Sequence, residues 1–127
     1  MAERAETVSV RRDVTKEELI QAIEKWLKYI DTYMNKMWFY GDDESANRYL
    51  SENLEAIIKS AKIASEMAYS YSVRMKSGEM YKDAKNLLKI SNALENGPDY
   101  EAGSVLSNAE YYVQDFLEEL RPYKEYE

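Results

Sequence analysis

The chain has 127 residues, a formal net charge of −7 and 45% hydrophobic residues, enough for one domain with a single buried core. Its lack of cysteine and histidine excludes disulfides, thiolate metal sites, cysteine nucleophiles and imidazole bases. The negative charge also argues against a generally basic nucleic-acid-binding protein.

Residues 1–14 are polar and show no hydrophobic period, so we interpret them as an N-terminal arm. They contain no apolar stretch of the kind found in secretory signals. No segment of the chain approaches the ~20 apolar residues of a transmembrane helix. We therefore expect a cytoplasmic protein that does not contact a membrane.

Apolar residues recur in steps of three and four as far as Tyr40, which predicts a first helix over residues 16–40. Thr15 and Glu18 have the spacing of a capping box, in which each side chain accepts a hydrogen bond from a backbone amide. Gly41 is expected to end the helix, because glycine readily adopts a positive φ.

The same spacing predicts a long second helix over residues 43–76, with acidic residues at its start, where the helix dipole favours them. No glycine or proline interrupts it, so it reaches ~50 Å at ~1.5 Å per residue. A break near residues 70–73 is the alternative interpretation, because those residues favour helix only weakly.

A third helix is predicted over residues 79–95 and a fourth over residues 100–121, with Asp99 as the N-cap of the fourth. Residues 122–127 are interpreted as an acidic tail that begins with a helix-ending proline.

Connections of a few residues favour antiparallel neighbouring helices. The predicted fold is therefore all-α, in one domain over residues 15–121. It is either a four-helix up-down bundle or two stacked antiparallel helical hairpins.

Nothing in the sequence predicts catalysis. The predicted inward stripes are apolar, the serines have no histidine base, and the glycines are too scattered for a phosphate-binding loop. Glu119 is expected to lie in an exposed acidic stretch where no neighbour changes its pKa. We therefore expect a protein that is not an enzyme, with no metal and no cofactor.

Aromatic residues are the first candidates for binding, because the chain contains 12 tyrosines. A tyrosine packs its ring while its hydroxyl stays available to a partner. Phe39 lies off the predicted stripe, either as a staple onto the next turn or as an exposed contact for a partner. The candidate protein-binding residues are Trp38, Phe39, Tyr69, Tyr71 and Tyr111.

Basic residues are the second candidates. Three lysines of the third predicted helix lie opposite its apolar stripe and form a basic ridge. Basic side chains among tyrosines suit a phosphate backbone with stacked bases, whereas a solvated face is the other interpretation. The candidates for binding nucleic acid or an acidic partner are Arg11, Arg12, Arg74, Lys76, Lys82, Lys85 and Lys89.

These features favour a non-catalytic helical interaction module, a small adaptor or assembly subunit that contacts a protein partner or a second copy of itself. The alternative is a nucleic-acid-associated structural subunit, of a ribonucleoprotein complex or a helical viral coat, that uses the basic ridge. A further alternative is an acidic inhibitor that imitates nucleic acid through residues 99–127.

Overall fold

The structure is a computed structural model that describes residues 14–125. Within this range it contains four α-helices and no strand, which confirms the prediction of an all-α chain. The helices are α1 (Lys16–Met34), α2 (Asp43–Met75), α3 (Gly78–Asn96) and α4 (Ala102–Leu120). Two short elements join them: the π-turn η2 (Asn35–Phe39) and the 3₁₀ turn η3 (Asp99–Glu101). Apart from Val14, the predicted arm lies outside the described residues.

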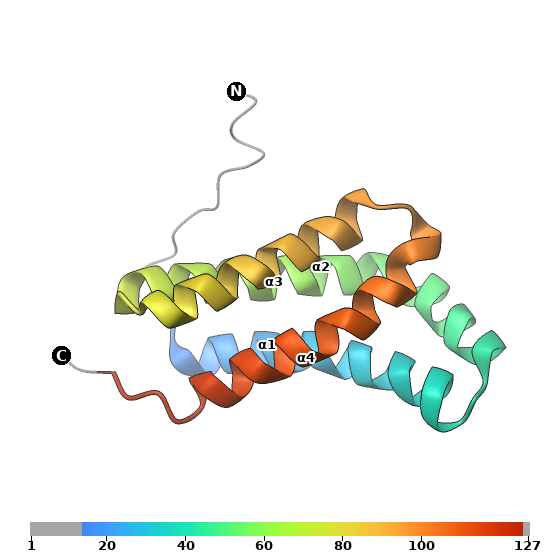
Figure 1. Cartoon of the computed structure of the whole chain (residues 1–127), viewed down its shortest axis with the longest axis horizontal. Helices are drawn as coiled ribbons and strands as arrows, with labels where there is room; N and C mark the ends of the chain where they lie inside the picture. The colour runs from blue at the N-terminus through green and yellow to red at the C-terminus, as the bar shows by residue number, and fades with distance from the viewer. Residues whose placement is uncertain (1–13, 126–127) are drawn as a thin grey trace.

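Successive helices run antiparallel and pack side by side, and α4 packs against both α1 and α3 (Figure 1). Contacts between α2 and α4 are few. The turn before α2 and the turn before α4 lie at the same end of the molecule (Figure 1). We call this end, residues 38–44 and 97–101, the double-turn end.

The core is formed by one apolar stripe from each α-helix, as the spacing in the sequence predicts. Three alanines of α2 (Ala61, Ala64 and Ala68) are fully buried, and such small side chains let neighbouring helices approach closely. The large side chains that fill the core include Trp26, Tyr71, Leu87 and Phe116.

The start of α1 has the predicted capping box. The amide of Glu18 donates to Thr15 Oγ1 at 3.1 Å, and the amide of Thr15 donates to Glu18 Oε1 at 3.0 Å. Nearby, Lys16 Nζ donates to the carbonyls of Arg121 and Tyr123 at 2.7 and 2.8 Å. These bonds tie the start of α1 to the end of α4.

The end of the first helix differs from the prediction. The amide of Tyr40 donates to the carbonyl of Asn35 at 2.9 Å, so the chain closes a wide π-turn after Met34. Because a π-turn holds more residues than an α-helical turn, the side chains after it rotate away from the core stripe. Tyr40, expected on that stripe, is 72% exposed. Gly41 then reverses the chain at φ 64°, as predicted.

Helix α2 is continuous from Asp43 to Met75, so the alternative of a break at residues 70–73 is wrong. Ser72 Oγ donates to the carbonyl of Tyr69 at 2.8 Å, which satisfies its hydroxyl inside the helix. Residues 70–72 are also buried against neighbouring helices, and such packing outweighs weak intrinsic helix propensity.

The start of α4 also differs from the prediction. Asp99 does not cap a helix; instead the amide of Glu101 donates to the carbonyl of Pro98 at 3.0 Å. This bond spans three residues and closes the first turn as the 3₁₀ turn η3, so that α4 begins only at Ala102.

Candidate interaction surfaces

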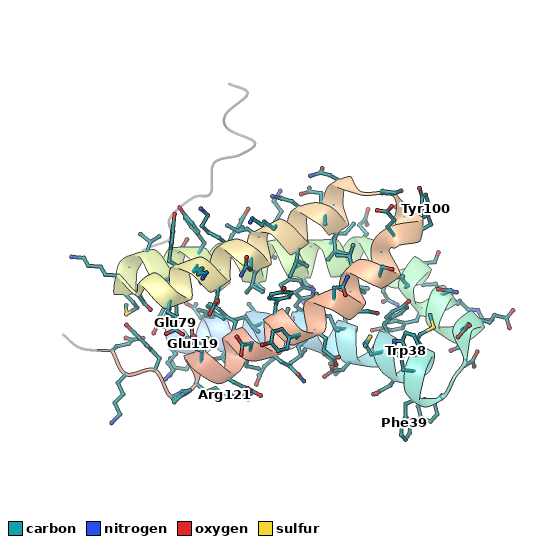
Figure 2. The ribbon with its side chains drawn as sticks, viewed as in Figure 1. Trp38, Phe39, Glu79, Tyr100, Glu119 and Arg121 are labelled. Carbon is teal, nitrogen blue, oxygen red and sulfur yellow. The ribbon has the colours of Figure 1, made fainter. Side chains whose placement is uncertain are left out.

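Four aromatic side chains are exposed at the double-turn end, and Figure 2 shows Trp38, Phe39 and Tyr100 at this end. The ring of Phe39 meets that of Tyr40 edge to face, with ring centres 5.0 Å apart, and is not covered by the following helix. The prediction of a staple onto the next turn is therefore wrong, and Phe39 is an exposed residue. The exposed fractions are Trp38 69%, Phe39 77%, Tyr40 72% and Tyr100 86%.

The same end carries negative charge. Residues 38–44 and 97–101 include no lysine or arginine. Asp42 caps α2 by accepting a hydrogen bond from the amide of Ser45 at 3.0 Å. Exposed aromatic rings and carboxylates therefore occur on both turns of this end. Its exposed acidic residues are Asp42, Asp43, Glu44, Asp99 and Glu101.

An open groove of about 610 Å³ lies beside these residues, between the first half of α2 and the start of α4. Leu50 and Leu54 contribute apolar walls, and Tyr100 contributes to its rim. Gly103 allows the close approach of Tyr33 here, because a Cβ atom at Gly103 would lie 2.3 Å from the Tyr33 hydroxyl. Burial, and to a lesser degree the charge of Asp43, raise the pKa of Tyr33, so its hydroxyl remains a hydrogen-bond donor.

The three predicted ridge lysines, Lys82, Lys85 and Lys89, are exposed along one face of α3. We call them the lysine ridge. Lys85 Nζ lies 5.5 Å from the centre of the Tyr81 ring, which supports a cation–π contact. Lys76 is exposed at the end of α2.

Two other predicted aromatic contacts lie elsewhere. Tyr69 is half-buried and packs its ring against Tyr81 of α3, with ring centres 5.3 Å apart. Tyr111 is exposed on α4, with its ring edge to face against Tyr112. The structure therefore does not bring these two tyrosines together with Trp38 and Phe39.

Tyr71 is a correction to the sequence prediction, because its side chain is fully buried. It lies on the inner stripe of α2, and its hydroxyl donates to the carboxylate of Glu125. Arg74 is half-buried, with its guanidinium 5.5 Å from the Tyr71 ring centre, and it donates to the carbonyl of Val14. Both residues therefore stabilise the fold. Arg11 and Arg12 lie outside the described residues.

The contact between α3 and α4 contains carboxyl groups that the sequence analysis placed in solvent. Glu119 is half-buried, and Figure 2 shows it beside Glu79. Burial, followed by the charges of Asp83 and Glu79, raises the pKa of Glu119 to about 7. The sequence did contain an indication that Glu119 is partly buried. It follows Val105 and Tyr112 at intervals of seven residues, which places it on one edge of the apolar stripe.

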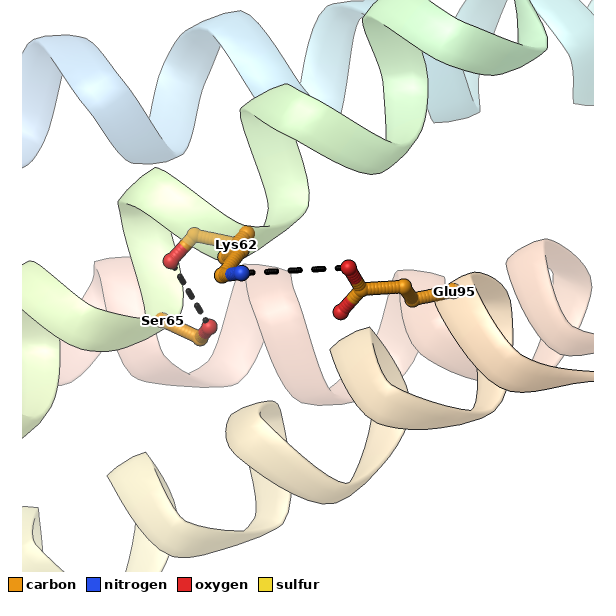
Figure 3. A network of polar contacts seen from close by, with 3 residues as sticks. All are labelled: Lys62, Ser65 and Glu95. Carbon is orange, nitrogen blue, oxygen red and sulfur yellow. Dashed lines mark hydrogen bonds and ion pairs between the residues drawn. The ribbon is translucent and has the colours of Figure 1, made fainter. Parts of the chain in front are cut away.

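A second polar contact joins α2 to α3 on the other side of the lysine ridge. Lys62 Nζ lies 3.7 Å from Glu95 Oε2, and Ser65 Oγ donates to the carbonyl of Lys62 at 3.1 Å (Figure 3). The carboxylate of Glu95 is therefore paired with a lysine of α2. It does not pair with the lysines of the ridge on its own helix.

Residues 14–125 contain no group of three or more acidic side chains arranged to hold a metal ion. No helix in this part of the chain combines the length and apolar character needed to cross a bilayer. Comparison with protein-family models, curated proteins and solved structures finds no match to this chain.

Proposed function

We propose that this chain is a non-catalytic helical interaction module, a small adaptor or assembly subunit that binds a protein through its double-turn end. The observation that carries the proposal is the exposure of three consecutive aromatic side chains, Trp38, Phe39 and Tyr40, each by more than two thirds. Exposed apolar patches mark interaction sites, and aromatic residues contribute most often to interface hot spots.

We further propose an up-down four-helix bundle as the framework of this module. In such a bundle the first and third connections lie at the same end, which agrees with the position of residues 38–44 and 97–101 at one end of the molecule. The backbone of the first turn is also ordered. The amide of Asp42 donates to the carbonyl of Lys36 at 2.8 Å, and Gly41 supplies the positive φ. A preformed turn loses little conformational entropy on binding.

A nucleic-acid-associated subunit is the second candidate. It is favoured by the exposure of the lysine ridge and by the position of Lys85 over the Tyr81 ring. Phosphates would contact the lysines while an unpaired base stacks on the tyrosine. In this case the double-turn end would contribute nothing to binding.

Site-specific photo-cross-linking tests the leading proposal. A photoreactive phenylalanine analogue replaces Phe39 in one variant and Ile63, an exposed apolar residue of α2, in the control. The protein joined to position 39, whether a partner or a second copy, is then purified and titrated with the unmodified chain. We expect Phe39→Ala to weaken this binding at least about tenfold, or ~1.4 kcal/mol, and Ile63→Ala to leave it nearly unchanged.

Two results would contradict the proposal. One is cross-linking of equal yield and to the same products from positions 39 and 63. The other is binding of the cross-linked protein that Phe39→Ala does not weaken.

A further inference from the structure

We propose that the double-turn end of one copy docks on the lysine ridge of a second copy. The inference rests on the proposed function, because it assigns a partner to the same aromatic surface. It goes further by naming that partner as this chain and by locating the receiving surface on α3.

The charges of the two surfaces are complementary. The double-turn end has five exposed carboxylates and no basic residue. The lysine ridge has three exposed ammonium groups on one helix face. Opposite charges across an interface steer encounter and fix the orientation of the partners.

The acidic residues of α3 lie to either side of the ridge, toward neighbouring helices, and only Asp83 is close enough to a ridge lysine, Lys82, for that lysine's charge to oppose the rise in its pKa. Glu95 is directed toward α2, where it pairs with Lys62. Glu79 and Asp83 lie near Glu119 of α4, whose pKa they raise. The outer face of α3 is therefore basic, although the helix carries equal numbers of acidic and basic side chains.

The aromatic rings provide the apolar part of the contact. A lysine side chain has an apolar stem that packs on a ring and an ammonium group that is attracted to the ring face. Lys85 already makes such a contact with Tyr81 inside one copy. The ridge from Lys82 to Lys89 is ~10 Å long at ~1.5 Å per residue. It is therefore longer than the 5.0 Å between the ring centres of Phe39 and Tyr40.

The symmetry of the assembly follows from the two surfaces being different. A contact between unlike surfaces leaves one end and one ridge unoccupied in every dimer. Further copies can then add, so that association gives rings or open chains instead of a closed dimer. Assembly should consequently grow with protein concentration through a series of sizes.

Reversing the charges of each surface separately tests the proposal. The ridge variant carries Lys82→Glu, Lys85→Glu and Lys89→Glu. The end variant carries Asp43→Lys, Glu44→Lys and Asp99→Lys, and keeps the helix cap Asp42. Sedimentation velocity at low salt measures association of each variant alone and of an equimolar mixture, after circular dichroism has shown that both remain helical.

We expect the wild-type chain to associate with increasing concentration and each variant alone to associate at least about tenfold more weakly. In each variant both surfaces carry the same sign of charge. In the mixture opposite signs meet again, so we expect association to recover to within about threefold of the wild type. If the charge reversal of the ridge unfolds the chain, a milder ridge variant is used, with Lys82→Gln, Lys85→Gln and Lys89→Gln. High salt is a test that needs no variant, because it should weaken association of the wild-type chain.

Three results would overturn this inference. A wild-type chain that is monomeric at every concentration overturns self-docking, while the proposed function still stands on the cross-link from Phe39. Association lost in the end variant but kept in the ridge variant places the receiving surface elsewhere. The third result combines two observations. The equimolar mixture of variants does not associate, and a single-stranded oligonucleotide binds the two chains that keep the ridge, the wild type and the end variant. The ridge would then be assigned to nucleic acid.

Discussion

Gly41 and Gly78 lie at two of the turns between the helices and differ in what the backbone requires of them. Gly41 follows η2 with φ 64°, in the left-handed region that side chains with a Cβ atom disfavour. Gly78 opens α3 and has nothing within 4 Å of the position that a Cβ atom would occupy. In the turn between α2 and α3, the residue that adopts the left-handed conformation is Lys76, with φ 56°. Only the first glycine is therefore required by the backbone.

We predict that Gly41→Ala lowers the free energy of unfolding by ~1–2 kcal/mol, because alanine is strained at this φ. Gly78→Ala is the matched control and should leave stability unchanged or raise it by ~0.4–1 kcal/mol, since alanine restricts the unfolded chain. Urea denaturation followed by circular dichroism measures both. Equal effects of the two substitutions would contradict the assigned role of Gly41.

At the scale of the elements, α4 carries two carboxyl groups whose pKa values are raised, one toward each neighbouring helix. On its α3 side, Glu119 lies near Asp83 and Glu79, with Asp115 on its own helix and Lys82 beside Asp83. On its α1 side, burial and a hydrogen bond with Asp31 raise the pKa of Glu110. Both contacts of α4 therefore bring carboxyl groups together, and ionisation of these groups opposes the packing.

The direction of the pH effect follows from the pKa of Glu119, which folding raises from 4.5 to about 7. Between these values the folded chain binds the proton more tightly than the unfolded chain does. The stabilisation is thus fully present below pH 4.5 and is lost as the pH rises to about 7.

We predict that Glu119→Gln raises the melting temperature at about pH 8, where it removes a disfavoured charge, and changes it little at about pH 4.5. At the higher pH the free energy of unfolding should rise by ~1–2 kcal/mol. The rise is limited to this range because solvent screens the charge of a half-buried carboxyl group. Glu118→Gln removes the same charge from an exposed neighbour and should show no such pH-dependent gain. Thermal unfolding at the two pH values measures the difference, and an equal gain from both variants would contradict the assignment.

At the scale of the whole molecule, the two tryptophans report on core and surface separately. Trp26 is fully buried among the helices, whereas Trp38 is 69% exposed at the double-turn end. The other residues of the described range, 14–125, leave most of the Trp38 side chain open to solvent. A second molecule that packs on this end would shield it.

We predict that acrylamide quenches the fluorescence of Trp38 and not that of Trp26 in dilute protein. In the Trp38→Phe variant the remaining emission should be blue-shifted and nearly unquenched, because Trp26 is shielded from solvent. Raising the protein concentration should then reduce quenching in the wild type as the double-turn end becomes covered. Quenching that stays constant while the protein associates would place the contact away from Trp38.

The inward stripes were predictable because they depend only on helical periodicity. The buried residues of α3, for example, follow one another in the steps of three and four that a helix face requires. They are Met80, Ala84, Leu87, Ser91 and Leu94. The Thr15–Glu18 capping box and the positive φ of Gly41 were also predictable, since each depends on residues that are neighbours in the sequence. The exposure of the lysine ridge followed from the same periodicity.

Tertiary structure decided what depends on residues far apart in the sequence. Packing against neighbouring helices kept α2 helical through its weakly helical residues 70–72. The approach of α3 placed Asp83 beside Glu119, and the packing of the residues after α4 brought the carboxylate of Glu125 to the Tyr71 hydroxyl. The sequence by itself thus determined the helices and their inner faces, because local periodicity and capping act within a few residues. Only the tertiary structure decided which outer side chains meet, because that depends on how the helices approach one another.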